Sequence, residues 1–175
     1  MAIDAFLYFP RKEILGETTD EKYKIHSAFA LKSYSFGAES TKTVGSSTPG
    51  GGGGKTSFEP FKLDKVADTA SCGIFSALCS GQHIDEAILV LRKSGGGGNS
   101  SGGEFMTYRF KMVIFKNYTV NGNEDETEES VEFDYGAIKI EYSEQKIDGN
   151  LTKASGTKGE AKWSQVKNKA VYSVV

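Results

Sequence analysis

A short stretch from Ser71 to Gly81 most constrains the fold, because it is the one segment with a clear helical pattern. Ser71 is suited to cap the start of a helix, and Gly81 can adopt the left-handed conformation that ends one. A helix of about nine residues is roughly 14 Å long and is not stable alone. It must therefore pack against a sheet. The residues predicted to form its buried stripe are Ile74, Phe75, Leu78 and Cys79.

Strand-like alternation of apolar and polar residues dominates the rest of the chain. The apolar residues of the alternation switch from one side of the strand to the other near Lys32 and again across Gly136. Each switch predicts a bulge. Asp148-Gly149 is typical of a hairpin turn. Seven or eight strands and one helix predict a mostly β fold. We expect a β-barrel of two antiparallel sheets with one short flanking α-helix, in a single domain over residues 1–175. The predicted strands cover residues 2–9, 23–36, 58–66, 83–93, 105–120, 131–142 and 159–163.

The charge pattern argues against several classes of partner. The 21 basic and 23 acidic residues are mixed along the chain and leave a net charge of −2, so we expect no nucleic-acid partner. The sequence has no apolar run of about 18 residues, so we expect no membrane insertion. Asp4 lies where a signal peptide carries a basic residue. We therefore expect a cytoplasmic chain that is exported, if at all, without a cleaved signal peptide.

The two cysteines, Cys72 and Cys79, are seven residues apart on the predicted helix. Their Cα atoms would be about 10 Å apart, which is too far for a disulfide. We expect both thiols to be free, as in a reducing compartment, and Cys79 to be buried against the sheet.

The sequence contains no convincing catalytic or ligand-binding motif. Residues 49–56 resemble a phosphate-binding loop, but Pro49 replaces its first glycine and Glu59-Pro60 follows where its helix should begin. We interpret this run as a flexible loop, and we expect no enzymatic activity, no cofactor and no metal. Three weaker features are interpreted as surface or turn residues: the SxxK matches at 143–146 and 164–167, the isolated His26 and His83, and the acidic stretch 124–129.

A series of short segments nevertheless resembles one known family, the haemolysin-coregulated protein (Hcp) family of bacterial type VI secretion. The resemblance lies in the order and spacing of the segments over nearly the whole chain. Cys72 departs from it, because many relatives have proline at this first helical position. The segments are Met1–Phe6, Ser33–Gly37, the glycine run before Lys55, Ser80–Ile84, Leu91–Gly96, Ile140–Tyr142, Asp148-Gly149 and Lys162-Trp163.

The resemblance implies a structural role. Family members form a six-membered ring with a wide bore, and the rings stack into the inner tube of a contractile, phage-tail-like injection machine. The partners that it implies are other copies of the chain, the sheath proteins, a spike protein at the tube tip and effector proteins in the bore. Strands with free edges, which need a partner, agree with this assignment.

The resemblance also suggests where contacts occur. Ser33 and Ser35 are expected to line the bore and face cargo, although they also fit ordinary solvent-facing strand positions. The loop between Gly37 and Ser57 is expected to contact the next ring, although it also fits a surface insertion without a role. Its predicted ring-stacking residues are Thr43, Val44, Gly50, Gly51, Gly52, Gly53, Gly54 and Lys55.

An alternative function belongs to a different class: a monomeric β-barrel that binds a small ligand or a carbohydrate. The particle mass in solution distinguishes a ring from such a monomer.

Overall fold

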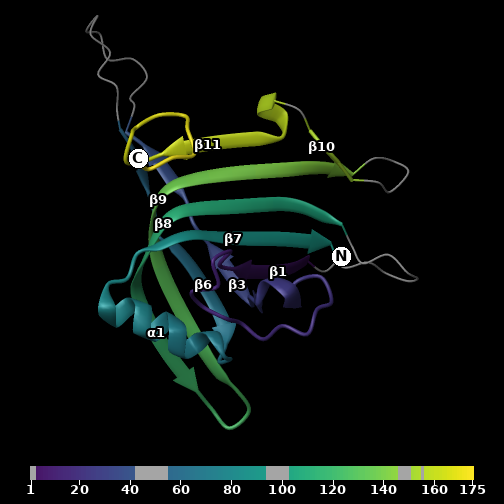
Figure 1. Cartoon of the computed structure of the whole chain (residues 1–175), viewed down its shortest axis with the longest axis vertical. Helices are drawn as coiled ribbons and strands as arrows, with labels where there is room; N and C mark the ends of the chain where they lie inside the picture. Colours follow the sequence, from purple (N-terminus) through teal and green to yellow (C-terminus); the bar gives the residue numbers. More distant parts are fainter. Residues whose placement is uncertain (1–2, 42–54, 94–102, 146–150, 155) are drawn as a thin grey trace, which may run out of the picture.

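A computed structural model describes residues 3–41, 55–93, 103–145, 151–154 and 156–175. Within these residues the chain forms eleven strands, one α-helix and two short 3-10 turns (Figure 1). The helix is α1 (Ala70–Ser80), and the 3-10 turns are η1 (Lys24–His26) and η2 (Gly156–Lys158). The strands are β1 (Ile3–Tyr8), β2 (Phe29–Ala30), β3 (Ser33–Ser35), β4 (Ala38–Ser40), β5 (Thr56–Phe58), β6 (Phe61–Val66), β7 (Ile84–Lys93), β8 (Glu104–Gly122), β9 (Thr127–Gln145), β10 (Leu151–Lys153) and β11 (Glu160–Ser164).

Nine strands form one antiparallel sheet in the order β2-β1-β7-β8-β9-β6-β3, with β10 and β11 also paired to β9. The remaining two strands, β4 and β5, form a separate hairpin. Figure 1 shows the large sheet curled, with α1 beside it, and α1 contacts β8. The predicted fold class is therefore confirmed: mostly β and antiparallel, with one flanking helix. The two sheets differ greatly in size, and the larger one forms the barrel wall.

A single segment, residues 29–35, closes this wall. Its first strand, β2, pairs with β1 at one end of the strand order, and its second, β3, pairs with β6 at the other end. Between them, the Leu31 amide donates to the Ala5 carbonyl over 2.9 Å, and the Lys32 amide donates to the Asp64 carbonyl over 2.8 Å. The segment thus bridges the two edges of the sheet, so the sheet curls back on itself.

The prediction of one strand over residues 23–36 is only partly correct. Its beginning forms the 3-10 turn η1, and its end is divided between β2 and β3. The apolar residues do switch sides near Lys32, as predicted. The cause is a change of partner strand and not a bulge. Phe29 faces the core beside β1, and Tyr34 packs against the core beside β6.

The other strand predictions agree well with the structure. The strands predicted over 83–93, 105–120, 131–142 and 159–163 correspond to β7, β8, β9 and β11, with only His83 and Gly159 just outside β7 and β11, and β7 is buried on both faces as expected. The predicted strand over 58–66 is interrupted between β5 and β6. The turn predicted at Asp148-Gly149 lies outside the described residues.

In both long strands, β8 and β9, the alternation of inward- and outward-facing residues shifts by one residue. The two shifts lie opposite each other in the sheet. Met112 and Gly136 lie opposite each other between the pairs Lys111↔Ala137 and Val113↔Tyr135, and Met112 has a φ of 55°. Gly136 has no room for a side chain, because a Cβ there would lie 2.8 Å from Val174 Cγ1 and 3.2 Å from Met112 Cβ. The predicted parity change at Gly136 is present, whereas the register shift of this strand pair lies at Phe115/Asn117.

Aromatic rings fill the inside of the barrel. Phe61, Phe110 and Phe133 are fully buried, and their ring centroids are 4.8 to 5.5 Å apart. The Tyr135 ring lies 4.9 Å from that of Phe110. Stacked and edge-on aromatic pairs of this kind add to the stabilisation from apolar burial.

The helix begins at Ala70, two residues earlier than predicted, and Ser71 is not its N-cap. Asp68 Oδ1 instead accepts from the Ala70 amide at 2.9 Å, while the Asp68 amide donates to Ser71 Oγ at 3.0 Å. Ser71 therefore supports the first turn from inside the helix. The predicted end is confirmed, because Gly81 has a φ of 65° and its amide donates to the Leu78 carbonyl.

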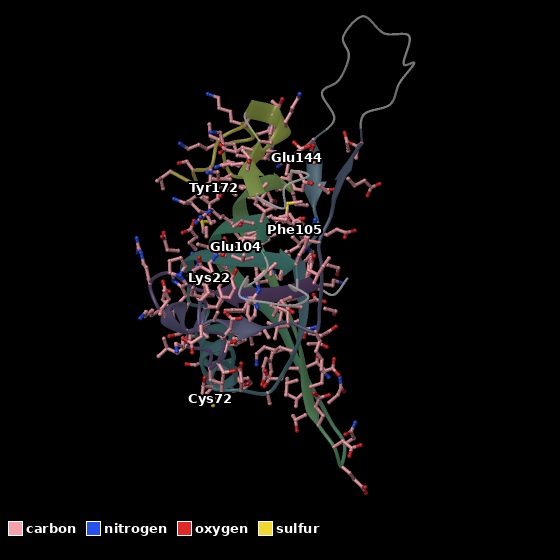
Figure 2. The ribbon with its side chains drawn as sticks, turned by 90° about the vertical axis from the view of Figure 1, so that its right-hand side faces the viewer. Lys22, Cys72, Glu104, Phe105, Glu144 and Tyr172 are labelled. Carbon is pink, nitrogen blue, oxygen red and sulfur yellow. The ribbon has the colours of Figure 1, made fainter. Side chains whose placement is uncertain are left out.

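The buried face of α1 also differs from the prediction. Ala70, Ile74 and Ala77 are buried, whereas Phe75 remains 53% exposed and Cys79 is exposed, so the expected burial of Cys79 is wrong. The helix also lies close to the segment that follows β1, because a Cβ at Gly73 would be 3.3 Å from the side chain of Ile14. Both cysteines are free, as expected, and Figure 2 shows Cys72 in the lower half of the view, above the tip of the long strands β8 and β9.

A buried ion pair joins the helix start to the barrel. Lys65 is fully buried on β6, and its Nζ lies 2.9 Å from Glu129 Oε2 on β9 and 2.7 Å from Asp68 Oδ1. Tyr118 on β8 donates to Glu129 Oε1 at 2.6 Å. Burial alone would raise the pKa of Glu129, but the hydrogen bonds from Lys65 and Tyr118 hold that pKa below its ordinary value. Lys65 therefore links β6 and β9 to the start of the helix, and Tyr118 of β8 joins this group through Glu129.

Replacing Lys65→Met should lower the free energy of unfolding by about 3–5 kcal/mol, because it leaves buried carboxylates without their cation. Lys62→Met is the matched control, since Lys62 lies on the same strand and pairs with Glu132 of β9 at 3.4 Å, but is exposed. Its loss should be below about 1 kcal/mol. Denaturant unfolding measures both variants, and equal losses would contradict the structural role of the buried pair.

Candidate functional site

The strands β3, β6, β9 and β8 present one continuous polar face to the outside of the barrel. Alternate residues of these strands, such as Tyr34, Leu63 and Val131, pack in the core. The residues between them point outward in register across the strands. One cross-strand row consists of Ser33, Asp64, Ser130 and Thr119, and the next row consists of Ser35, Lys62, Glu132 and Asn117.

Asp64 organises the first row through two hydrogen bonds. Ser33 Oγ donates to Asp64 Oδ2 at 2.5 Å, and Ser130 Oγ donates to Asp64 Oδ1 at 2.6 Å. The hydroxyl of Ser130, then that of Ser33, lowers the pKa of Asp64 below its ordinary value, and the nearby charge of Lys32 adds to this effect. The carboxylate is therefore ionised at neutral pH, and both serine hydroxyls are held in fixed orientations.

Ser35 in the second row has a different environment. It is exposed, and within the described residues its side chain makes no hydrogen bond. Its neighbours Lys62 and Glu132 form an ion pair of 3.4 Å across β6 and β9. The two serines predicted to act together are thus adjacent on one face, but Ser35 alone has a hydroxyl without an internal partner.

A shallow depression of about 290 Å³ lies on this face. Ser33 and Ser35 form its β3 side, Lys62 and Asp64 its β6 side, and Ser130 with Glu132 its β9 side. Of these residues, the sequence predicts only Ser33 and Ser35 as site residues. The alternation Phe61-Lys62-Leu63-Asp64 was the available signal for the β6 residues, because it places two polar side chains on the face opposite the core.

The predicted ring-stacking loop lies largely outside the described residues, which omit residues 42–54. Lys55 is described and exposed, and its carbonyl accepts from Thr41 Oγ1 at 3.5 Å. The residues on either side of the loop pair as β4 and β5, from Ala38↔Phe58 to Ser40↔Thr56. This hairpin holds the two ends of the loop together.

The structure also shows the surroundings of the sequence features that were interpreted above as loop, surface or turn residues. Thr56 opens strand β5, so no helix follows the phosphate-loop-like run as such a loop requires. The ring of His26 stacks on Tyr8 at 4.6 Å. In the acidic stretch 124–129, the first three residues lie in the β8–β9 turn as expected, whereas the last three belong to β9 and Glu129 is buried. Among the described residues, no three metal-ligating side chains cluster, and no helix is long and apolar enough to cross a membrane.

Comparisons with known proteins agree on one group. The family described as "Type VI secretion system effector, Hcp" matches residues 6–142. Protein hcp1 of Pseudomonas aeruginosa is 27% identical over 97 residues, which span 54% of this chain and 58% of that protein. The alignment therefore covers little more than half the length of this relative.

Solved structures extend the similarity over nearly the whole chain. A structure described as a type six secretion system protein superposes with a TM-score of 0.81 at 27% identity, covering 96% of this chain and 99% of that one. Hcp1 from Salmonella typhimurium gives a TM-score of 0.74 at 28% identity, covering 98% of this chain and 100% of that one. The curled antiparallel sheet with its single flanking helix is thus a fold found in bacterial type VI secretion proteins. Because the family match spans most of its length, the chain belongs to the Hcp family.

Proposed function

We propose that this chain is the subunit of a type VI secretion tube. Six copies form a ring around a bore, and rings stack into a tube that sheath proteins surround and a spike protein closes at the tip. Residues 1–175 act as one Hcp-like barrel domain. The chain is made in the cytoplasm, leaves without a cleaved signal peptide, and acts as a structural and cargo-binding protein rather than an enzyme. Membership of the Hcp family supports this proposal.

The filled interior favours the tube over the alternative of a monomeric ligand-binding barrel. Such a barrel holds its ligand in an internal cavity. Here Phe61, Phe110 and Phe133 occupy the middle of the barrel with no exposed surface. The surface available to another molecule is therefore the outer wall, which in a ring of copies becomes the wall of the bore.

The polar outer face of β3, β6, β9 and β8 carries this proposal. Its residues are small or charged, whereas the opposite face of the same strands is the core. A passage through which proteins move needs side chains that bind weakly and do not trap apolar surface. We propose that Ser33 and Ser35 face the bore and contact effector proteins.

The β4–β5 hairpin supports a separate role for the loop it carries. Within the described residues these strands pair only with each other, and Ala38, Glu39 and Ser40 are all exposed. We propose that the loop residues from Thr43 to Lys55 contact the neighbouring ring and become ordered by pairing with one of its strands.

Native mass spectrometry of the secreted protein tests the ring and the export route together. We expect a particle of six times the 18.9 kDa chain mass, built from chains with no N-terminal cleavage beyond Met1. Ring closure should make this mass persist at micromolar concentration. A monomeric mass at tens of micromolar, in low and moderate salt alike, would contradict the ring and favour the alternative.

Substituting Ser35→Gln tests the bore assignment. The longer side chain should leave the ring mass unchanged, because Ser35 makes no internal hydrogen bond, while crowding the passage and reducing retention of a co-expressed effector. Pull-down from matched cultures measures retention. Thr119→Gln, on the same face, is a comparison at another outward position. Unchanged retention by intact Ser35→Gln rings would refute the assignment.

Replacing Thr43 to Lys55 with a short Gly-Ser link tests the stacking loop. Among the described residues, the core is formed by segments outside this stretch, so rings should form with little change in mass. Tubes should be lost in negative-stain images, because the contact between rings is missing. Tubes that assemble normally without the segment would show that the loop has no stacking role.

A further inference from the structure

The row Ser33–Asp64–Ser130 presents hydrogen-bond acceptors on the outer face. Its own donors, the two serine hydroxyls, are already engaged with Asp64. Each serine has one hydroxyl proton, and both protons are donated to Asp64, over 2.5 and 2.6 Å. The serine oxygens keep free lone pairs, and each Asp64 oxygen has capacity for a further donor. An incoming group must therefore supply the protons.

Asp64 also has no cation of its own. Within the described residues it forms no ion pair, although two lysines lie nearby. Lys62 pairs with Glu132 at 3.4 Å. Lys32 is bound to Glu126 and lies 3.6 Å from Glu128. Each neighbouring cation thus has another partner, and Asp64 forms no ion pair with either, although the charge of Lys32 is felt at its carboxylate.

The row borders the shallow depression on the outer sheet face, so its acceptors are open to another molecule. Asp64 is half-buried, with its carboxylate between two strands, and is held by neighbours on both sides. A guanidinium group suits such a site, because its planar set of donors matches a carboxylate with flanking oxygens.

We propose that Ser33, Asp64 and Ser130 form a binding site for an arginine side chain on the surface of a cargo protein. The inference rests on the proposed function, because the site acts on cargo only if this face lines the bore. Each site binds weakly, since an exposed charge pair is screened by solvent and salt. Repetition around a ring lets several weak contacts hold one cargo molecule and still release it.

The test uses two fluorescent nine-residue peptides, one with three arginines and one with three citrullines. Citrulline keeps the planar shape and some of the N–H donors of arginine, but a carbonyl oxygen replaces one nitrogen and the charge is lost. We expect the arginine peptide to bind purified wild-type protein at least fivefold more tightly in fluorescence anisotropy, with a preference that falls as salt is raised. Equal binding of the two peptides would overturn the proposal.

Variants then locate the binding. Asp64→Asn should remove most of the arginine preference, because the amide is neutral, and Ser130→Ala should weaken binding about two- to fivefold. Asp85→Asn is the matched control, since Asp85 is an exposed aspartate on another strand that pairs with Arg11 at 3.3 Å. Unchanged arginine binding by folded Asp64→Asn protein, or an equal loss in Asp85→Asn, would overturn the site.

Two further measurements separate the failure of this inference from the failure of the proposed function. Thermal unfolding checks that each variant is folded, and the native mass reports the ring independently of the peptides. If wild-type protein is monomeric, the ring proposal is wrong, and the same peptide comparison on the monomer still decides whether the site recognises arginine. Hexamers without arginine preference would overturn the site alone.

Discussion

Closure of the large sheet by residues 29–35 is the constraint on which the rest of the structure depends. One segment supplies the pairing for β1 at one edge and β6 at the other, so neither edge is left open there. Closure also gives every strand an inside and an outside. Phe29 and Tyr34 pack against the core from this segment, and Ser33 points outward with Asp64.

Lys65 is the main exception to an apolar interior. A buried ammonium group is costly unless it is fully paired, and here it meets Glu129 and Asp68 together with a backbone carbonyl. Because Asp68 also holds the first turn of α1, the ion pair fixes where the helix begins against the barrel. The helix is short, and this attachment supplies a stabilisation that its own sequence does not.

The alternation that builds the core also builds the surface proposed to line the bore. In the proposed ring, the passage would run along the outer walls of the copies, and the interior of each barrel, filled by aromatic rings, would take no part in it. On that outer wall, Ser33 and Ser130 are fixed by Asp64, whereas Ser35 is free within the described residues. Neighbouring serines on one strand therefore contribute differently: one positions acceptors, and the other offers an open hydroxyl.

The sequence alone determined the local features: the helix end at Gly81, the two-sided strand β7, the long strands β8 and β9, and the outward parity of Ser33 and Ser35. These depend on backbone conformation and on side-chain periods, which neighbouring residues set. Tertiary structure decided the division of residues 23–36, the exposure of Cys79 and the pairing of Ser33 with Asp64. Each of these depends on contacts between segments far apart in the chain. The period of apolar residues indicates which face of a helix or strand is buried, but it does not indicate which segment packs against that face. The helix shows this most clearly: Ile74 of the predicted stripe is buried, whereas Phe75 and Cys79 are exposed and Ala70 and Ala77 are buried instead.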